Sequence, residues 1–165
     1  MATTNPVTWV LPIATEFFGS LLFAFFGGLA PAPYGAFANG LALAVLIYCC
    51  ASVSGGHLNP AVSLSIMITG HLPWIQGVLY IVAQIAGMIG GAALTRALKP
   101  DSLVDPGCFF INGISHVQLW AWELIMTLLL VSTVHSVAVS MKGHGESNRC
   151  SSHGPLFVPI ANGVC

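Results

Sequence analysis

Long apolar runs without charge clusters alternate along the chain with short segments rich in polar residues, glycine or proline. Four of these runs are close to the 20 or so apolar residues that a helix needs to cross a bilayer. They predict membrane-spanning helices over residues 10–30, 36–53, 73–98 and 119–141. A shorter apolar segment, residues 60–69, lies between the second and third of these runs. As a helix it would be about 15 Å long, so it could reach only halfway across a membrane.

Residues around this short segment predict where the helix begins and ends. Asn59 is a good N-cap, because its side chain can accept a hydrogen bond from the first turn. Pro60 suits the first helical position, where a missing N–H costs nothing. Gly55 and Gly56 allow backbone conformations that other residues resist, and Gly70 is expected to end the helix.

A half-length helix inside a membrane is tolerated only where its irregular backbone is buried in protein or lines an aqueous cavity. Its N-terminus would bring a partial positive charge to the middle of the membrane. Such an end, together with the Asn59 amide, can orient a polar solute and repel a cation. The alternative is an ordinary Asn-Pro turn between two helices of a soluble protein.

Composition favours the membrane interpretation. Of the 165 residues, 56% are hydrophobic and 5% are charged, whereas soluble proteins carry about 25% charged residues. The net charge of −1 offers no basic surface for nucleic acid. Five cysteines without a Cys-x-x-Cys pair predict neither a disulfide framework nor a cysteine-rich zinc site. The first apolar run lacks a preceding basic region, so we interpret it as a retained span and not as a cleaved signal.

The sequence SGGHLNPAVSL at residues 54–64 resembles the first Asn-Pro-Ala box of the aquaporin, or major intrinsic protein, family. The Ser-Gly-Gly-His form is most similar to the branch that holds animal aquaporin-eight types and plant tonoplast channels. The resemblance implies an all-α membrane protein, a right-handed helical bundle of two inverted repeats. The first repeat would be complete, with three spans and one re-entrant half-helix, and the second would be truncated in its second span.

The same resemblance implies the function. We expect a channel for passive transport of water and small neutral solutes such as ammonia, hydrogen peroxide, urea or glycerol, with no catalytic group, cofactor or metal. The family assembles as homotetramers and places the N-terminus and the loop at residues 142–154 in the cytoplasm. A multi-pass protein of either the plasma membrane or an intracellular membrane would fit. The alternative is a truncated, non-conducting chain that acts at most as an assembly partner of full-length subunits.

Roles for individual residues follow from the family pattern. Asn59 would donate a hydrogen bond to the passing solute and so break proton wires, while Pro60 and Ala61 shape the helix tip. One wall of the pore would be a ladder of backbone carbonyl acceptors from Gly55, Gly56 and His57. The His57 side chain would narrow the cytoplasmic vestibule, or alternatively serve only a structural role by bonding to a neighbour.

Polar residues within the predicted spans are the remaining pore candidates. Glu16 and Glu123 are single carboxyl groups in apolar surroundings, where they are costly and need partners. They could carry protons or bind ions, but we expect them, with Gln84, to hold the free amides of re-entrant loops. Asn39 falls at the family's filter position in the second span, which usually holds a large aromatic residue or histidine. An amide there predicts a wider, more polar opening.

Two pairs of segments repeat in the same order. EFFGSLL at residues 16–22 matches ELIMTLL at 123–129, and FANGL at 37–41 matches IANGV at 160–164. Three predicted spans separate the copies, so the copies should be inverted in the membrane, unless the similarity arose by chance between apolar helices. Asn59 follows Asn39 by 20 residues, so Asn162 predicts a second box near residue 182, beyond the last residue here.

These patterns divide the chain into three parts. Residues 1–98 are expected to form the first repeat, residues 99–118 a connecting loop, and residues 119–165 a partial second repeat. The last part would contain the loop at 142–154 and the start of another span at 155–165. That loop carries three potential zinc ligands, His144, Cys150 and His153, but three ligands on a flexible loop without a fourth are more often simply solvated. In the third span, Ala83, Gly87 and Gly91 form a stripe of small residues that lets another helix approach closely.

Overall fold

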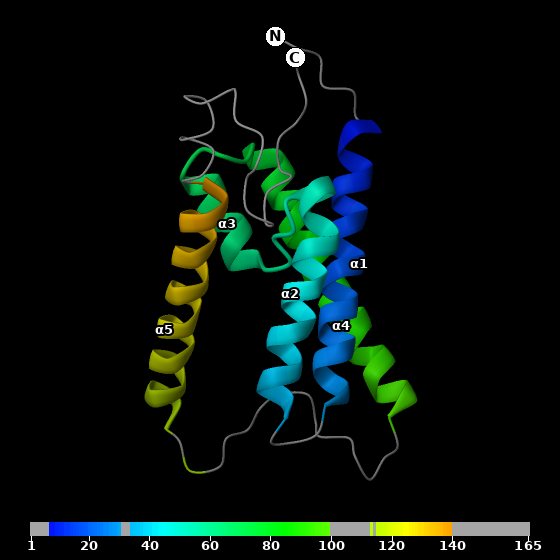
Figure 1. The fold of residues 1–165 in the computed structure, drawn as a ribbon, viewed down its shortest axis with the longest axis vertical. Coiled ribbons are helices and arrows are strands. Elements are labelled where there is room, and N and C mark those ends of the chain that lie inside the picture. Colours follow the sequence, from blue (N-terminus) through cyan, green and yellow to red (C-terminus); the bar gives the residue numbers. More distant parts are fainter. Residues whose placement is uncertain (1–6, 31–33, 100–112, 114, 140–165) are drawn as a thin grey trace, which may run out of the picture.

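The computed structural model describes residues 7–30, 34–99, 113 and 115–139, and all regular structure within them is helical. Four helices are long and apolar enough to cross a membrane, and a fifth is short. Figure 1 shows α1 (Val7–Leu29), α2 (Gly35–Ser54), α3 (Pro60–Ile68), α4 (Trp74–Leu98) and α5 (His116–Val134), which continues as the π-helix η2 (His135–Val139). The predicted all-α architecture of long helices with one half-length helix is therefore confirmed.

Among the described helices, α1 makes the most extensive contacts, and α4 and α2 pack along its sides (Figure 1). α4 lies directly on the α1 backbone, because a Cβ added at Gly87 would overlap the Phe17 carbonyl oxygen and one at Gly91 would overlap that of Leu21. One turn further on, the Thr95 hydroxyl lies 3.2 Å from the Phe25 carbonyl oxygen. The small-residue stripe of α4 is thus a helix contact, as predicted.

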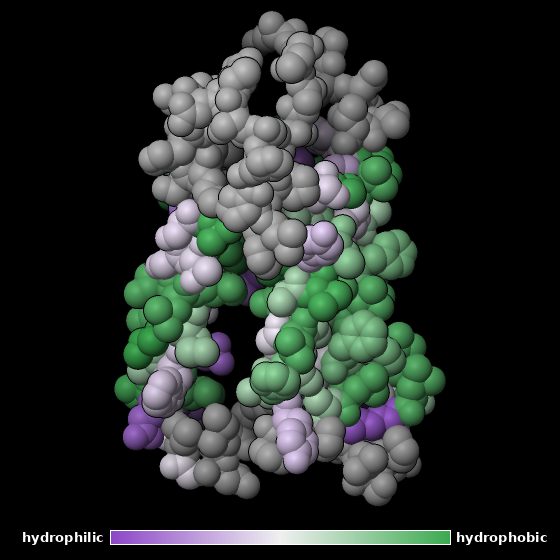
Figure 2. Space-filling view, viewed as in Figure 1, coloured by the Kyte–Doolittle hydropathy of each residue, from purple (hydrophilic) through white to green (hydrophobic). Residues whose placement is uncertain are grey.

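Large apolar side chains remain exposed on the outer faces of the long helices (Figure 2). They include residues of α1, α2 and α4, such as Phe18, Phe37, Tyr48, Val82 and Ile89. In water such a surface would favour aggregation, whereas in a bilayer it matches the hydrocarbon of the lipid. The small interior holds polar residues such as Glu16, Ser63 and Gln84 beside its apolar ones, and buried polar groups need hydrogen-bond partners.

α3 is a helix of its own in the chain, with residues 55–59 between it and α2 and residues 69–73 between it and α4. It is nine residues, about 14 Å, long. It ends one residue earlier than predicted because Thr69 takes the cap position, and the chain then turns at Gly70, with φ of +78°. Four of its side chains are buried: Val62, Ser63, Ile66 and Met67. The short helix is thus inserted among the other helices and does not lie on the surface.

α5 runs in the opposite direction to α1 (Figure 1), as inverted repeats require. Its tertiary contacts are mainly with α3, and none of its residues is buried. It begins at His116, three residues before the predicted start, because Ser115 and Gln118 form a capping box that extends the first turn. The predicted loop at 142–154 and the start of a span at 155–165 lie outside the described residues, as does most of the predicted connection at 99–118.

Candidate functional site

The loop between α2 and α3, residues 55–59, has an unusual backbone. Gly55 and Gly56 have φ values of +95° and +63°, and Leu58 has φ of +48°. The left-handed conformation costs a leucine about 1–2 kcal/mol. Its side chain is fully buried, against Gly19 of α1 and in one cluster with Cys50 of α2. Apolar packing from two helices thus supports this conformation.

Four hydrogen-bond donors converge on the carboxylate of Glu16, which is fully buried in α1. The backbone amides of His57 and Leu58 donate to it over 3.0 and 2.7 Å. The Ser54 hydroxyl donates over 2.5 Å, and Nε2 of Gln84 over 2.7 Å. A buried carboxylate is stable only when such bonds replace its lost hydration. Glu16 and Gln84 are thus brought together at the loop, one from α1 and one from α4.

Further polar side chains extend this network. Nε2 of Gln84 also donates to the Ser63 hydroxyl over 2.9 Å, and that hydroxyl lies 3.1 Å from Nδ1 of His57. The Tyr80 hydroxyl donates to the Ser54 carbonyl over 3.1 Å, and the Tyr80 ring lies edge-on to the His57 ring at 5.5 Å. The His57 ring is therefore held by two neighbours.

Ser54, Ser63 and Tyr80 are contributors that the sequence analysis did not single out. A signal for Tyr80 was present, because it lies between Gln76 and Gln84 at four-residue spacing on one face of an otherwise apolar helix. Nε2 of Gln76 donates to the Tyr80 hydroxyl over 3.0 Å. The two serines lie within the Asn-Pro-Ala box, but no spacing in the sequence pairs them with Glu16 or Gln84.

Asn59 caps α3 as predicted. Its backbone is extended, its Oδ1 accepts a 2.8 Å hydrogen bond from the Ala61 amide, and Pro60 occupies the first helical position. Because Oδ1 faces the helix, the Nδ2 group is directed away from it. Within the described part of the chain, Nδ2 has no acceptor, and no hydrogen bond ends on the carbonyl oxygens of Gly55, Gly56 or His57. Among the described residues, the loop therefore carries one donor and three acceptors without partners.

Asn39 lies in the contact between α1 and α2. Its Nδ2 donates to the Gly35 carbonyl over 2.9 Å, and its Oδ1 occupies the space that a Cβ at Gly27 would need. The structure does not bring this amide into the hydrogen-bond network of the loop. Its role as a filter residue stays a prediction.

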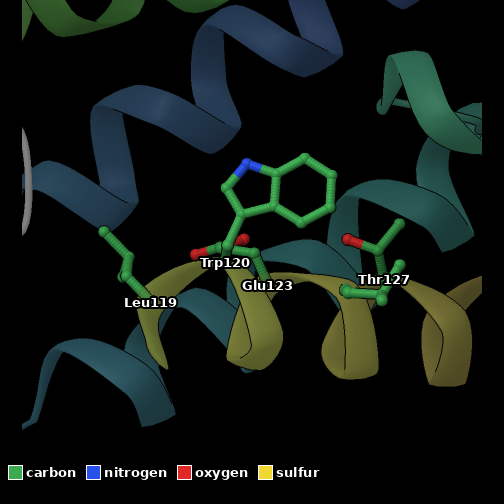
Figure 3. A pocket seen from close by; sticks show the side chains of 5 residues that line it. Leu119, Trp120, Glu123 and Thr127 are labelled. Atoms are coloured by element: carbon green, nitrogen blue, oxygen red, sulfur yellow. The ribbon is translucent and has the colours of Figure 1, made fainter. Parts of the chain in front are cut away.

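Glu123 has surroundings unlike those of Glu16. It is exposed and lines a hollow of about 330 Å³ beside α5, together with Leu119, Trp120, Leu124 and Thr127. Figure 3 shows Trp120 and Thr127 rising from the same side of α5. Among the described residues, no hydrogen bond reaches the Glu123 carboxylate and no second re-entrant loop lies beside it. Its predicted partner loop therefore stays a prediction.

A metal centre of three or more ligands is absent from the described ranges, where no three His, Cys, Asp or Glu side chains lie close enough together. The potential zinc ligands His144, Cys150 and His153 lie outside those ranges.

Comparison with known proteins agrees with this arrangement. The family model "Major intrinsic protein" matches residues 5–164. The chain belongs to the major intrinsic protein family. Aquaporin-8 of Notomys alexis is 34% identical, over 99% of this chain and 69% of its own length. Aquaporin-2 of Bos taurus is 31% identical, over 86% of this chain and 56% of its own length. Aquaporin TIP2-1 of Zea mays is 31% identical, over 82% of this chain and 60% of its own length.

Family membership and the four long apolar helices together make this major intrinsic protein an integral, multi-pass membrane protein. The chain spans a little over half of Aquaporin-2 and 60% of Aquaporin TIP2-1. The matches include Aquaporin-8 and a TIP aquaporin, the two groups that the Ser-Gly-Gly-His form indicated, alongside Aquaporin-2.

Proposed function

We propose that this protein is a passive membrane channel of the aquaporin type, in which water and small neutral solutes pass the tip of α3. One observation carries the proposal. The N-terminus of a half-length helix is held among the long helices, and within the described residues the Asn59 amide donor and the carbonyl acceptors just before it have no partners. Such a row of donors and acceptors can replace the hydrogen bonds that a solute loses when it leaves bulk water.

Asn59 orients the solute in this mechanism. Its Nδ2 donates to the oxygen of a water molecule, and the positive end of the α3 dipole favours the same orientation. A water molecule held in this way directs both hydrogens away from Asn59, so it cannot accept a proton from a neighbour on that side. The same dipole repels cations, which leaves neutral solutes such as ammonia, hydrogen peroxide, urea and glycerol as candidates beside water.

Glu16 and Gln84 position the loop in this proposal and do not contact solute. The Glu16 carboxylate is enclosed by four donors, which supports a role in holding loop amides and not in proton transfer. The bonds of the His57 ring to Ser63 and its packing on Tyr80 favour the structural alternative for that side chain. The backbone carbonyls of Gly55, Gly56 and His57 would still form the acceptor ladder.

A second candidate function is a non-conducting subunit that associates with full-length aquaporins. Most α5 side chains are exposed in the described structure and the others are half-buried, which favours this function. It is also favoured by the apolar outer faces of α1, α2 and α4, which could contact other subunits in a homotetramer or a mixed assembly.

Stopped-flow swelling of liposomes separates the two candidates. Vesicles with the purified chain alone should be more water-permeable than empty vesicles, and Asn59→Ala should lower that permeability. Asn59→Asp keeps an N-cap acceptor but adds a negative charge, so this variant should admit cations, measured as a sodium leak.

Water flux equal to that of empty vesicles would refute the channel function. Altered flux on co-reconstitution with full-length Aquaporin-8 would then support the assembly function. Ser136→Ala is a control, because its exposed hydroxyl bonds to the Ser132 carbonyl and lies outside the α3 network.

A further inference from the structure

Two histidines from separate elements approach the same hydroxyl group where the end of α5 meets α3 (Figure 1). His71 belongs to the turn after α3, and its Nδ1 lies 3.2 Å from Oγ1 of Thr69. His135 is the first residue of η2, and its Nε2 lies 3.4 Å from the same oxygen. The His71 side chain is exposed and that of His135 half-buried, so both rings are accessible from outside the bundle.

The tautomer of His135 is determined by its own helix. Its Nδ1 lies 3.0 Å from the Val131 carbonyl oxygen, which can only accept, so Nδ1 carries the hydrogen. In the neutral ring, Nε2 therefore keeps a lone pair, on the side of the ring that approaches Thr69. An Nδ1–H bond to a backbone carbonyl is the arrangement that usually orients a metal-binding histidine.

The Thr69 hydroxyl has a single hydrogen, for which several acceptors compete. Its hydrogen is close to two carbonyl oxygens of its own helix, those of Ser65 at 3.0 Å and Ile66 at 3.2 Å. Thr69 is therefore not committed to donating to either imidazole. Nδ1 of His71 and Nε2 of His135 therefore both lie within 3.4 Å of one hydroxyl oxygen that cannot donate to both of them.

We propose that His71 and His135 bind one divalent transition-metal ion, of the class of Zn²⁺, Ni²⁺ or Cu²⁺, across the contact between α3 and α5. Imidazole nitrogen is a preferred ligand for these ions, whereas Ca²⁺ and Mg²⁺ prefer oxygen ligands. The His71 side chain is exposed, so its ring can reorient, and each nitrogen would lie about 2 Å from the bound ion. Water fills the other positions, so this is an exchangeable site and not a structural one with four protein ligands.

The test is metal titration of the purified 165-residue chain in detergent, with Zn²⁺ and Ni²⁺ as probes and calorimetry as the readout. His71→Ala and His135→Ala should each weaken binding by about tenfold or more. Both side chains are at least partly exposed, so circular dichroism should show unchanged helix content in either variant. This readout does not depend on solute flux, so it stands or falls separately from the channel function.

Two control variants use other histidines of the chain. His116→Ala removes a histidine at the opposite end of α5, and the double variant His144→Ala with His153→Ala removes those after η2. Both should bind the probes like the original chain. Unchanged binding in His71→Ala and His135→Ala, or loss of binding in either control, would overturn the proposal.

Discussion

Glu16 and Glu123 hold equivalent positions in two repeated segments, and their surroundings differ sharply. Glu16 is fully buried between α1 and α4 and accepts four hydrogen bonds. Glu123 is exposed beside a hollow along α5, and no described residue donates to it. The repeated segment thus supplies a carboxylate in both places, while the donors in the first place come from other parts of the chain.

This difference shows what makes a carboxylate tolerable within an apolar helix bundle. Removing it from water costs several kcal/mol, and the cost is offset only if donors meet it in good geometry. Around Glu16, those donors are two loop amides, the Ser54 hydroxyl and the Gln84 amide. α1 can hold such a loop because α2 and α4 pack along it, whereas α5 contacts mainly α3.

The largest effect is expected for Glu16→Gln compared with Glu123→Gln. A glutamine at position 16 would direct an NH₂ group at some of the four donors and lose the charge of the acceptor. We expect the free energy of unfolding to fall by about 3 kcal/mol, and by less than about 0.5 kcal/mol for Glu123→Gln. Equilibrium unfolding by SDS in mixed micelles, followed by tryptophan fluorescence, measures both. Equal losses in the two variants would remove the distinction between the two carboxylates.

The close contact of α1 with α4 is tested by two glycines of α4. A Cβ at Gly87 would overlap the Phe17 carbonyl oxygen, whereas one at Gly90 would lie 3.5 Å from a Leu21 methyl group, an ordinary contact. Gly87→Ala should therefore cost about 1–3 kcal/mol by forcing the helices apart. Gly90→Ala should be neutral or stabilising by up to about 1 kcal/mol, because alanine favours the helix. The same unfolding assay applies, and a Gly87→Ala variant as stable as Gly90→Ala would contradict the described contact.

A smaller effect is expected for Ser54→Ala. Its hydroxyl donates to Glu16 and accepts a 3.1 Å bond from the Gly56 amide, so its loss leaves two polar groups underbonded. We expect a destabilisation of about 1–2 kcal/mol in the unfolding assay. Ser136→Ala is the matched control, because within the described residues the exposed Ser136 hydroxyl bonds only to the Ser132 carbonyl. A loss as large in Ser136→Ala would show that the hydroxyl itself, and not its position beside Glu16, determines the effect.

The helices and the ends of α3 could be predicted from sequence because their causes are local. Apolar runs of membrane-spanning length specify the long helices, and Asn59, Pro60 and Gly70 act on the backbone within one turn. The earlier start of α5 was also encoded locally, by Ser115 and Gln118. These features require no knowledge of what packs against them.

The details of the loop could not be predicted, because they depend on residues distant in the chain. The left-handed Leu58 is supported by Gly19, which leaves space for its side chain. The Asn39 amide is in contact with α1 because Gly27 has no side chain there. Gln84 could be singled out from the family pattern, but its bond to Ser63 depends on how α3 packs against α4.

The smallest effect is expected at the start of α5, for Ser115→Ala. The Ser115 hydroxyl accepts from the Gln118 amide over 3.3 Å, and its loss should destabilise the first turn by about 1 kcal/mol. Because α5 has few tertiary contacts, the change should stay local. Amide hydrogen exchange should speed up in the first turn of α5 and stay constant in α1 and α4. Faster exchange in α1 would mean that α5 stabilises the packing of α1 against α4. Glu16 and Glu123 would then belong to one cooperatively folded unit.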